Sequence, residues 1–87
     1  MILGIEGGGT KTVAVTSDGR CRTFGPLHLK LSSDRQILAV LRQFKPARAA
    51  LCLAGCRTQA DRQRLRTLAH RAWPKARSVF IGNDLDS

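Results

Sequence analysis

The first part of the chain consists of three short β-type segments separated by strong turn signals. An apolar run over 2–5 stops at three consecutive glycines, and a β-branched run over 12–16 stops at Ser-Asp-Gly. The Asp-Gly pair is typical of a hairpin turn. Residues 20–24 then alternate between polar and apolar positions before Gly25 and Pro26 interrupt them. The pattern predicts three strands joined by tight turns in an antiparallel meander.

After Ser33 the apolar positions recur at helical spacing. The first predicted helix has Ser33 as its N-cap and ends before Pro46, and its apolar positions are Ile37, Leu38, Leu41 and Phe44. The second begins with the capping-box pattern of Thr58 and Asp61 and ends at Pro74. Its apolar positions are Leu65, Leu68, Ala69, Ala72 and Trp73.

Two more strands are predicted in the second half of the chain. The uninterrupted apolar run over 49–54 is typical of a strand buried on both faces of a parallel sheet, and 78–81 forms the fifth strand. The element order is therefore strand, strand, strand, helix, strand, helix, strand. Right-handed crossovers place the last two strands parallel to the first. We expect one α/β domain over 1–87, a mixed sheet with helices packed on its faces, in the topology of a ribonuclease H-like domain.

The charge balance is the unusual feature of the composition. Fifteen Lys and Arg residues against six carboxylates give a formal charge of +9. Such an excess attracts polyanions, including nucleic acid, nucleotide phosphates and acidic membrane surfaces, and charge alone does not choose among them. The basic residues are scattered with hardly any aromatic residues between them, which favours a solvated basic surface.

Neither the cysteines nor the apolar runs indicate an exported or membrane-spanning chain. The three cysteines lack a C-x-x-C spacing, no apolar run approaches 18 residues, and the first residues lack a charged signal-peptide region. We expect a cytoplasmic protein with reduced thiols and no membrane partner. Cys52 and Cys56 are interpreted as small buried hydrophobic residues and not as metal ligands.

The segment from Glu6 to Thr12 carries the strongest chemical signal. Consecutive glycines between two strands can take positive φ and let the backbone approach a ligand, and amides turned inward form an anion-binding nest. Glu6 could hold a hydrated Mg²⁺ beside the phosphates. The alternative is a plain hairpin turn, but such a turn needs only one or two glycines. The candidate phosphate-binding residues are Gly7, Gly8, Gly9, Thr10 and Lys11.

The same segment, with Ser-Asp-Gly-Arg after the next strand, resembles the opening of the BadF/BadG/BcrA/BcrD ATPase family, which includes N-acetylglucosamine kinases. This family belongs to the actin, sugar kinase and Hsp70 superfamily. The resemblance continues through Leu-Ala-Gly-Cys-Arg at 53–57 and the strand ending at Asn83 and Asp84. It implies an actin-like ATPase fold and binding of ATP with Mg²⁺, and it implies that Asp84 is the general base toward the hydroxyl of a phosphoryl acceptor. Asp84 could equally be a turn residue or a helix N-cap.

The chain departs from the family pattern in ways that limit the expected activity. Amino-sugar kinases usually carry a Ser-Asn or Thr-Asn pair before the first helix, and 26–31 contains no Asn. The second phosphate loop and the adenosine site are also missing. We therefore expect a truncated N-terminal lobe of a kinase or ATPase that binds nucleotide and is not active alone, with a small sugar or another acceptor as its substrate in a complete enzyme.

Two alternatives come from other functional classes. A ribonuclease H-like nucleic-acid enzyme or binder would suit the charge and the topology, but it needs clustered carboxylates for two metal ions. Glu6 and Asp84 could supply two of them and Asp86 a third. The other alternative is a non-catalytic remnant that forms homo-oligomers through exposed apolar surface.

Overall fold

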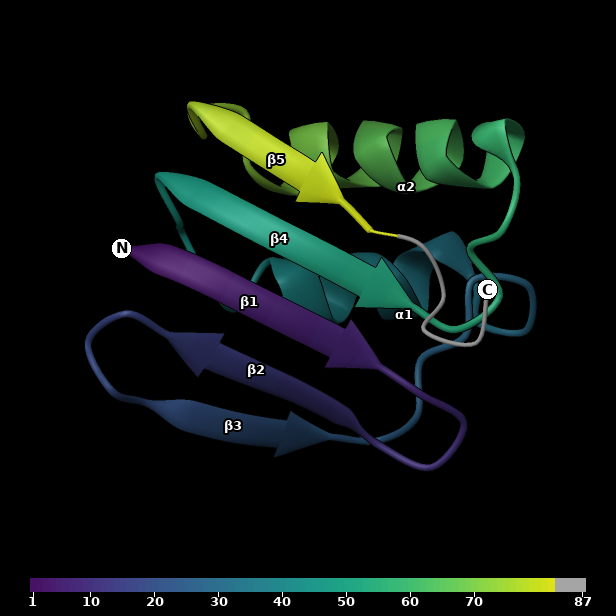
Figure 1. Ribbon diagram of the computed structural model, residues 1–87, viewed down its shortest axis with the longest axis horizontal. Helices are drawn as coiled ribbons and strands as arrows, with labels where there is room; N and C mark the ends of the chain where they lie inside the picture. The colour runs from purple at the N-terminus through teal and green to yellow at the C-terminus, as the bar shows by residue number, and fades with distance from the viewer. Residues whose placement is uncertain (83–87) are drawn as a thin grey trace.

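The computed structural model describes residues 1–82, which form one mixed five-stranded sheet and two helices (Figure 1). The elements in chain order are β1 (Ile2–Gly7), β2 (Thr12–Thr16), β3 (Cys21–Phe24), α1 (Asp34–Leu41), β4 (Arg48–Leu53), α2 (Gln59–Ala72) and β5 (Ser78–Ile81). The spatial order of the strands is β3-β2-β1-β4-β5. The first three pair antiparallel, whereas β4 pairs parallel with β1 and β5. The α/β class and the mixed sheet are thus as predicted.

Both helices begin where the sequence predicts, and each start is fixed by a capping box. The hydroxyl of Ser33 accepts from the Gln36 amide at 3.1 Å, and the Gln36 side chain accepts from the Ser33 amide at 2.7 Å. Thr58 and Asp61 make the same reciprocal pair at 3.1 Å each way. These contacts satisfy amide donors that the first turn of a helix leaves unpaired, so the short motifs define the helix starts.

The first helix is shorter than its apolar pattern suggests. It ends at Leu41, so Phe44 lies in the turn that follows rather than on the helix. Phe44 is still buried, and its ring meets that of Phe24 edge to face with 6.1 Å between the centroids. Tertiary packing therefore uses the aromatic side chain even though the helical hydrogen bonds have stopped.

Both helices cover the same face of the sheet, which corrects the expectation of helices on its two faces (Figure 1). The inward-facing residues of β1, β2, β4 and β5 pack with the apolar sides of α1 and α2 in one core. Its large members with less than 2% exposure include Leu3, Leu29, Ile37, Leu41, Leu51, Leu53 and Leu65. The opposite side, which we call the open face, carries Gly4, Val15, Ala50 and Phe80.

The prediction that β4 is buried on both faces is wrong. Ala49, Leu51 and Leu53 are buried, but Ala50 is exposed and Cys52 is only half-buried. The sequence concealed this alternation because Ala and Cys are small and apolar, and they are compatible with either side of a sheet. For Cys52 the expected burial is therefore also wrong, whereas Cys56 is fully buried as expected.

Polar contacts hold α2 against the loop before α1 and against the first residue of α1. The ammonium group of Lys30 lies 2.7 Å from the carboxylate of Asp61, and the guanidinium of Arg64 lies 2.6 Å from that of Asp34. The hydrogen bond from Lys30 lowers the pKa of Asp61 well below its usual range, helped by the amides of Thr58 and Arg57. Neither helix within 1–82 is long and apolar enough to cross a membrane.

Candidate functional site

The turn between β1 and β2 lies at the carboxyl end of the central strand. The Gly8 amide donates to the Lys11 carbonyl at 2.9 Å, so it supports the shape of the turn and does not face a ligand. The amides of Gly9 and Thr10 have no hydrogen-bond partner among residues 1–82. Gly9, Thr10 and Lys11 are all exposed. The turn therefore presents two unpaired backbone donors, a hydroxyl and an ammonium group to solvent.

The surroundings of the three consecutive glycines differ, so the reason why glycine occupies each position differs as well. A Cβ on Gly7 would lie 2.5 Å from Leu53 Cδ2 and 3.2 Å from the Leu27 carbonyl oxygen, so core packing alone excludes a side chain there. A Cβ on Gly8 would be in ordinary contact with the Lys11 carbonyl at 3.6 Å, and one on Gly9 would meet nothing within 4 Å. Of the three glycines, Gly9 thus has the most open space beside its backbone.

None of these glycines has a positive φ, contrary to what the sequence suggested. Within the described part of the chain, only Gly19 and Gly55 take that conformation, at φ values of 93° and 86°. Gly19 belongs to the hairpin after β2, as the Asp-Gly signal predicted. A left-handed backbone is therefore not the reason for the glycines at 7–9, and close packing accounts for Gly7.

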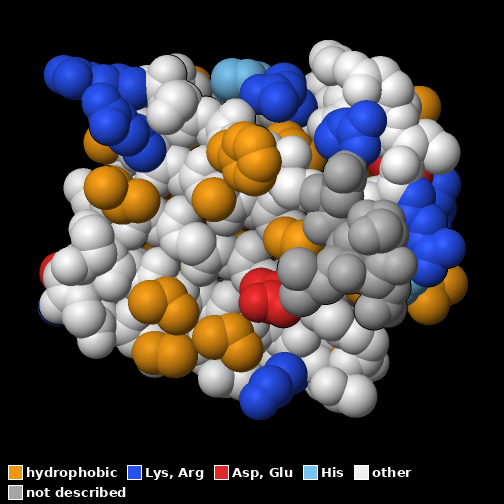
Figure 2. All heavy atoms as spheres, in the orientation of Figure 1, with side chains coloured by type: hydrophobic (Ala, Val, Ile, Leu, Met, Phe, Trp, Pro, Cys, Tyr) orange, Lys and Arg blue, Asp and Glu red, His pale blue; other side chains and the backbone are white. Residues whose placement is uncertain are grey.

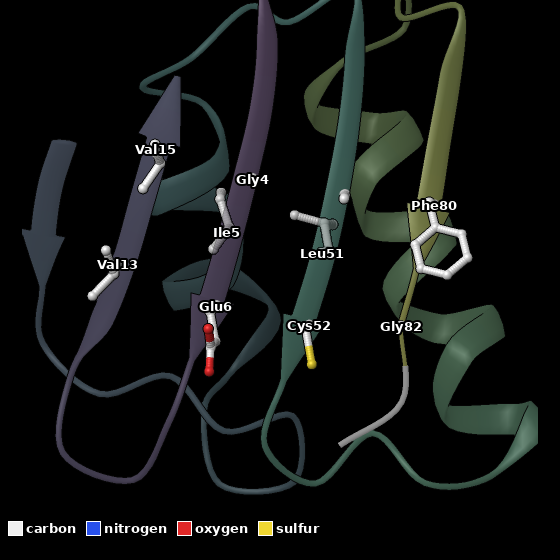
Figure 3. A pocket seen from close by; sticks show the side chains of 10 residues that line it. Gly4, Ile5, Glu6, Val13, Val15, Leu51, Cys52, Phe80 and Gly82 are labelled. Carbon is white, nitrogen blue, oxygen red and sulfur yellow. The ribbon is translucent and has the colours of Figure 1, made fainter. Parts of the chain in front are cut away.

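Glu6 projects from the end of β1 onto the open face, two residues before the turn (Figure 3). It is exposed, and its neighbours in register are Val13 on β2 and Cys52 on β4. Figure 3 shows its carboxylate and the Cys52 thiol pointing the same way, at the end of a hollow of about 330 Å³ that reaches Phe80 and Gly82. The carboxylate is thus available to a cation in solvent beside the turn.

Asp84, the residue proposed as general base, lies outside the described residues. So does Asp86, the third carboxylate that a nuclease would need. Asp34 is engaged by Arg64 at the start of α1. Within 1–82 no group of three His, Cys, Asp or Glu side chains is arranged to hold a metal ion.

Two features beside the turn were not expected from the sequence. The ring of His28 packs on Gly55, where an added Cβ would lie 2.4 Å from its Cε1, and its Nδ1 accepts from the Lys30 amide at 3.1 Å. The hydroxyl of Thr12 is buried and has no hydrogen-bond partner within the described part of the chain. Neither the packing of His28 nor the environment of the Thr12 hydroxyl could be predicted from the sequence, because each depends on how distant segments pack together.

The segment around His28 is hydrogen-bonded, through Ala54, to the end of β1 where the glycine turn begins. After β1 leaves the sheet, the Ala54 amide donates to the Gly7 carbonyl at 2.8 Å, and the Leu29 amide donates to the Ala54 carbonyl at 2.8 Å. His28 pairs with Ala54 in an isolated parallel bridge. The loop before α1 therefore occupies the position beside β4 that β1 vacates, and it fixes where the glycine turn begins.

Comparison with known proteins finds a solved structure with a similar fold. No family model matches the chain, and neither does any curated protein. The structure is similar to a solved protein of Porphyromonas gingivalis that is provisionally named N-acetylglucosamine kinase, with a TM-score of 0.74 at 19% sequence identity. The superposition covers 98% of this chain and 35% of that chain, so this chain spans about a third of the other's length. At this level of identity the likeness establishes a shared fold.

Proposed function

We propose that this chain is the ATP-phosphate-binding part of an N-terminal lobe of a BadF-type ATPase or N-acetylglucosamine-type sugar kinase. In this proposal the domain is ribonuclease H-like, of the actin-like ATPase kind, and is incomplete as a catalyst. One observation carries it: at the carboxyl end of the central strand, the exposed Glu6 is followed by a turn in which the amides of Gly9 and Thr10 have no hydrogen-bond partner among residues 1–82. The fold similarity to the named kinase supports it.

The residues present fit a magnesium nucleotide. Two unpaired amides, the Thr10 hydroxyl and the Lys11 ammonium are donors suited to phosphate oxygens, and Gly9 leaves space for them. Glu6 would hold Mg²⁺ through its water ligands, because Mg²⁺ prefers oxygen and keeps much of its hydration. Bound Mg²⁺ would supply neutralisation of phosphate charge. Gly7 and Gly8 would shape the turn rather than touch the nucleotide.

The proposed acceptor chemistry rests on Asp84 and on groups outside this chain. Asp84 is proposed as the general base on the strength of the family resemblance. Phosphoryl transfer depends on positioning and charge neutralisation from both sides of a cleft, and one turn with one carboxylate supplies a single side. A small sugar or other hydroxyl acceptor is the proposed substrate of a complete enzyme.

The binding proposal is tested by titrating the 87-residue chain with magnesium ATP and following backbone amide resonances. We expect the resonances of 8–11 to shift. Gly9→Ala should weaken the apparent affinity by about tenfold or more, since its methyl group enters the space left for phosphate. Gly25→Ala is the matched control, because a Cβ there also meets nothing within 4 Å. Unmoved resonances at saturating nucleotide would refute the proposal.

The catalytic limit is tested separately by supplying ATP, Mg²⁺ and a panel of amino sugars. Turnover by the chain alone should stay below about 1 per second, the low end of kinase rates. Faster turnover that disappears in Glu6→Gln would show that the chain is a complete enzyme. This outcome would contradict the claim of incompleteness while leaving nucleotide binding intact.

A further inference from the structure

A second hollow lies at the opposite end of the sheet from the glycine turn. It has a volume of about 510 Å³, and pockets that bind small molecules measure about 300–1,000 Å³. Its walls are the two segments that lead from the helices back to the sheet, 45–47 before β4 and 72–76 before β5, and Met1 completes the lining. We call this feature the amino-end pocket.

Hydrogen bonds join the two walls of the amino-end pocket. The Arg77 amide donates to the Ala47 carbonyl at 2.7 Å, and the Ala47 amide donates to the Met1 carbonyl at 3.0 Å. Between the two helix ends, the indole Nε1 of Trp73 donates to the Leu41 carbonyl at 2.8 Å. Each wall also contains a proline, which fixes φ at its position. The pocket is therefore preformed, which lowers the ordering cost that a ligand must overcome.

The lining of the amino-end pocket is apolar except for two lysines. The apolar residues are Met1, Pro46, Ala47, Ala72, Trp73, Pro74 and Ala76. Lys45 stands in one wall and Lys75 in the other, and both are exposed. Neither ammonium group has a hydrogen bond or a salt bridge to another residue within 1–82. Each wall therefore brings an unpaired positive charge to an apolar surface.

No carboxylate among the described residues lines this pocket and neutralises the two lysines. Glu6 ends β1, and Asp34 and Asp61 lie in the first turns of the helices, so all three are at the other end of the sheet. Asp18 lies at the same end as the pocket, in the turn after β2, but its carboxylate is 3.8 Å from the guanidinium of Arg20. A ligand would therefore meet the lysines without competition from a carboxylate of the lining.

The helix dipoles oppose an anion at this end, but the lysines outweigh them. Both helices end beside the pocket, and each C-terminus carries about −0.5 elementary charge against two full positive charges. Exposed Arg48 and Arg77, where β4 and β5 begin, add to the positive side. Figure 2 shows Lys and Arg side chains gathered at this corner of the molecule, in the upper left of the view. The local charge therefore favours an anionic ligand.

We propose that the amino-end pocket binds a small organic carboxylate with an apolar body. The apolar lining would contact the body, and Lys45 and Lys75 would donate charge-assisted hydrogen bonds to the carboxylate. An inorganic anion would leave the apolar lining without contact, and a neutral ligand would leave both lysines unpaired. This site goes beyond nucleotide binding, because it uses none of residues 6–11 and lies at the other end of the sheet.

Trp73 gives a direct readout of the pocket, because it is the only tryptophan in the chain and the chain contains no tyrosine. The probe is 3-phenylpropionate, and its controls are the amide, which has the same shape without charge, and acetate, which has the charge without the ring. The probe should change Trp73 fluorescence and shift the indole N–H resonance with a Kd on the order of 1 mM, as for a ligand of this size. The amide and acetate should bind at least about fivefold more weakly.

Three outcomes of this titration would overturn the proposal. Equal binding of the probe and its amide would show that the lysines do not select the ligand. Equal binding of the probe and acetate would show that the apolar lining is not used. An absence of change in both Trp73 signals at about ten times the expected Kd would show that the pocket does not bind the probe.

The charge contribution is tested by the double variant Lys45→Gln with Lys75→Gln, which should weaken binding of 3-phenylpropionate about fivefold or more. The matched control, Lys11→Gln with Arg35→Gln, removes the same charge from exposed positions at the other end of the molecule and should leave affinity within about twofold. Equal weakening by both pairs would reduce the effect to net charge. A lower Tm without weaker binding would mean that the lysines only stabilise the helix ends. Either result would contradict the proposal.

The location is tested by filling the pocket. Ala47→Leu should weaken binding of 3-phenylpropionate at least about tenfold, because the larger side chain takes the place of the ligand. Ala60→Leu, at an exposed position in the first turn of α2, is the matched control, and circular dichroism checks that both variants fold. If Ala47→Leu binds like the parent, the pocket is not the site. Nucleotide titration reads 8–11 and carboxylate titration reads Trp73, so the two proposals fail separately.

Discussion

The two faces of this sheet are built from alternate residues of the same strands, yet they differ in almost every physical respect. On the covered face, the strand residues pack against two helices and reach less than 10% exposure. On the open face, Ile2, Val15 and Phe80 are each at least half exposed. The comparison separates two tasks: the covered face holds the fold together, whereas the open face, with Glu6 at its edge, is the surface available for binding.

The largest expected effect contrasts Leu51 with Phe80. Leu51 is 1% exposed on the covered face, so Leu51→Ala should lower the free energy of unfolding by about 2–5 kcal/mol, the range for a cavity in a core. Phe80→Ala removes more atoms but from the open face, and should cost less than about 1 kcal/mol. Urea denaturation of both variants measures the difference.

If Leu51→Ala is too unstable to measure, a less destabilising substitution on the covered face can be compared with Phe80→Ala instead. Ile81→Val, also on the covered face, should then cost about 1 kcal/mol. Equal losses for the covered-face and open-face variants would mean that the open face is packed in solution, by association or otherwise.

A second contrast uses two glycines of β1 that face opposite ways. Gly7→Ala places a methyl group 2.5 Å from Leu53 Cδ2 and should cost about 1–3 kcal/mol, as overpacking does. Gly4→Ala places one on the open face, 4.0 Å from the Val15 carbonyl oxygen, and should raise stability by up to about 1 kcal/mol by restricting the unfolded chain. Thermal unfolding distinguishes opposite shifts in Tm. A tolerated Gly7→Ala would contradict the steric account of Gly7.

The smallest effect concerns two threonines on the covered side of β2. Thr12 buries a hydroxyl without a partner, so Thr12→Val should stabilise the fold by about 1 kcal/mol. The Thr16 hydroxyl bonds to Asp18 and accepts from the Arg20 amide at 3.2 Å, so Thr16→Val should destabilise it by a similar amount. Chemical denaturation of the pair measures both signs. If Thr12→Val is also destabilising, its hydroxyl has a partner in solution.

Two predictions that rest on local sequence patterns were confirmed by the structure. Asp18 and Gly19 predicted the hairpin, and Thr58 with Asp61 predicted the start of α2. In each case the decisive contacts span four residues or fewer, so the neighbouring sequence contains all the chemistry that fixes them. The antiparallel meander and the parallel orientation of β4 and β5 relative to β1 then followed from general rules of chain connection.

The candidate site was predicted only in part. The sequence placed a glycine turn after a strand with Glu6 before it, and the structure has both. It could not separate the roles of the three glycines, because the reason for Gly7 is a contact with Leu53 and Leu27. Nor could it show the unpartnered hydroxyl of Thr12 or the support given by His28.

By itself, the sequence determined the elements, their order and the location of the glycine turn after β1, because periodicity and turn chemistry act over a few neighbouring residues. Only the tertiary structure decided that both helices pack on one side, leaving Ala50 exposed and Leu51 buried within the same apolar run. The reason is that Ala-Ala-Leu-Cys-Leu-Ala is compatible with cover on one face or on two. Which faces receive cover depends on where the connecting segments cross the sheet, and that is a property of the whole fold.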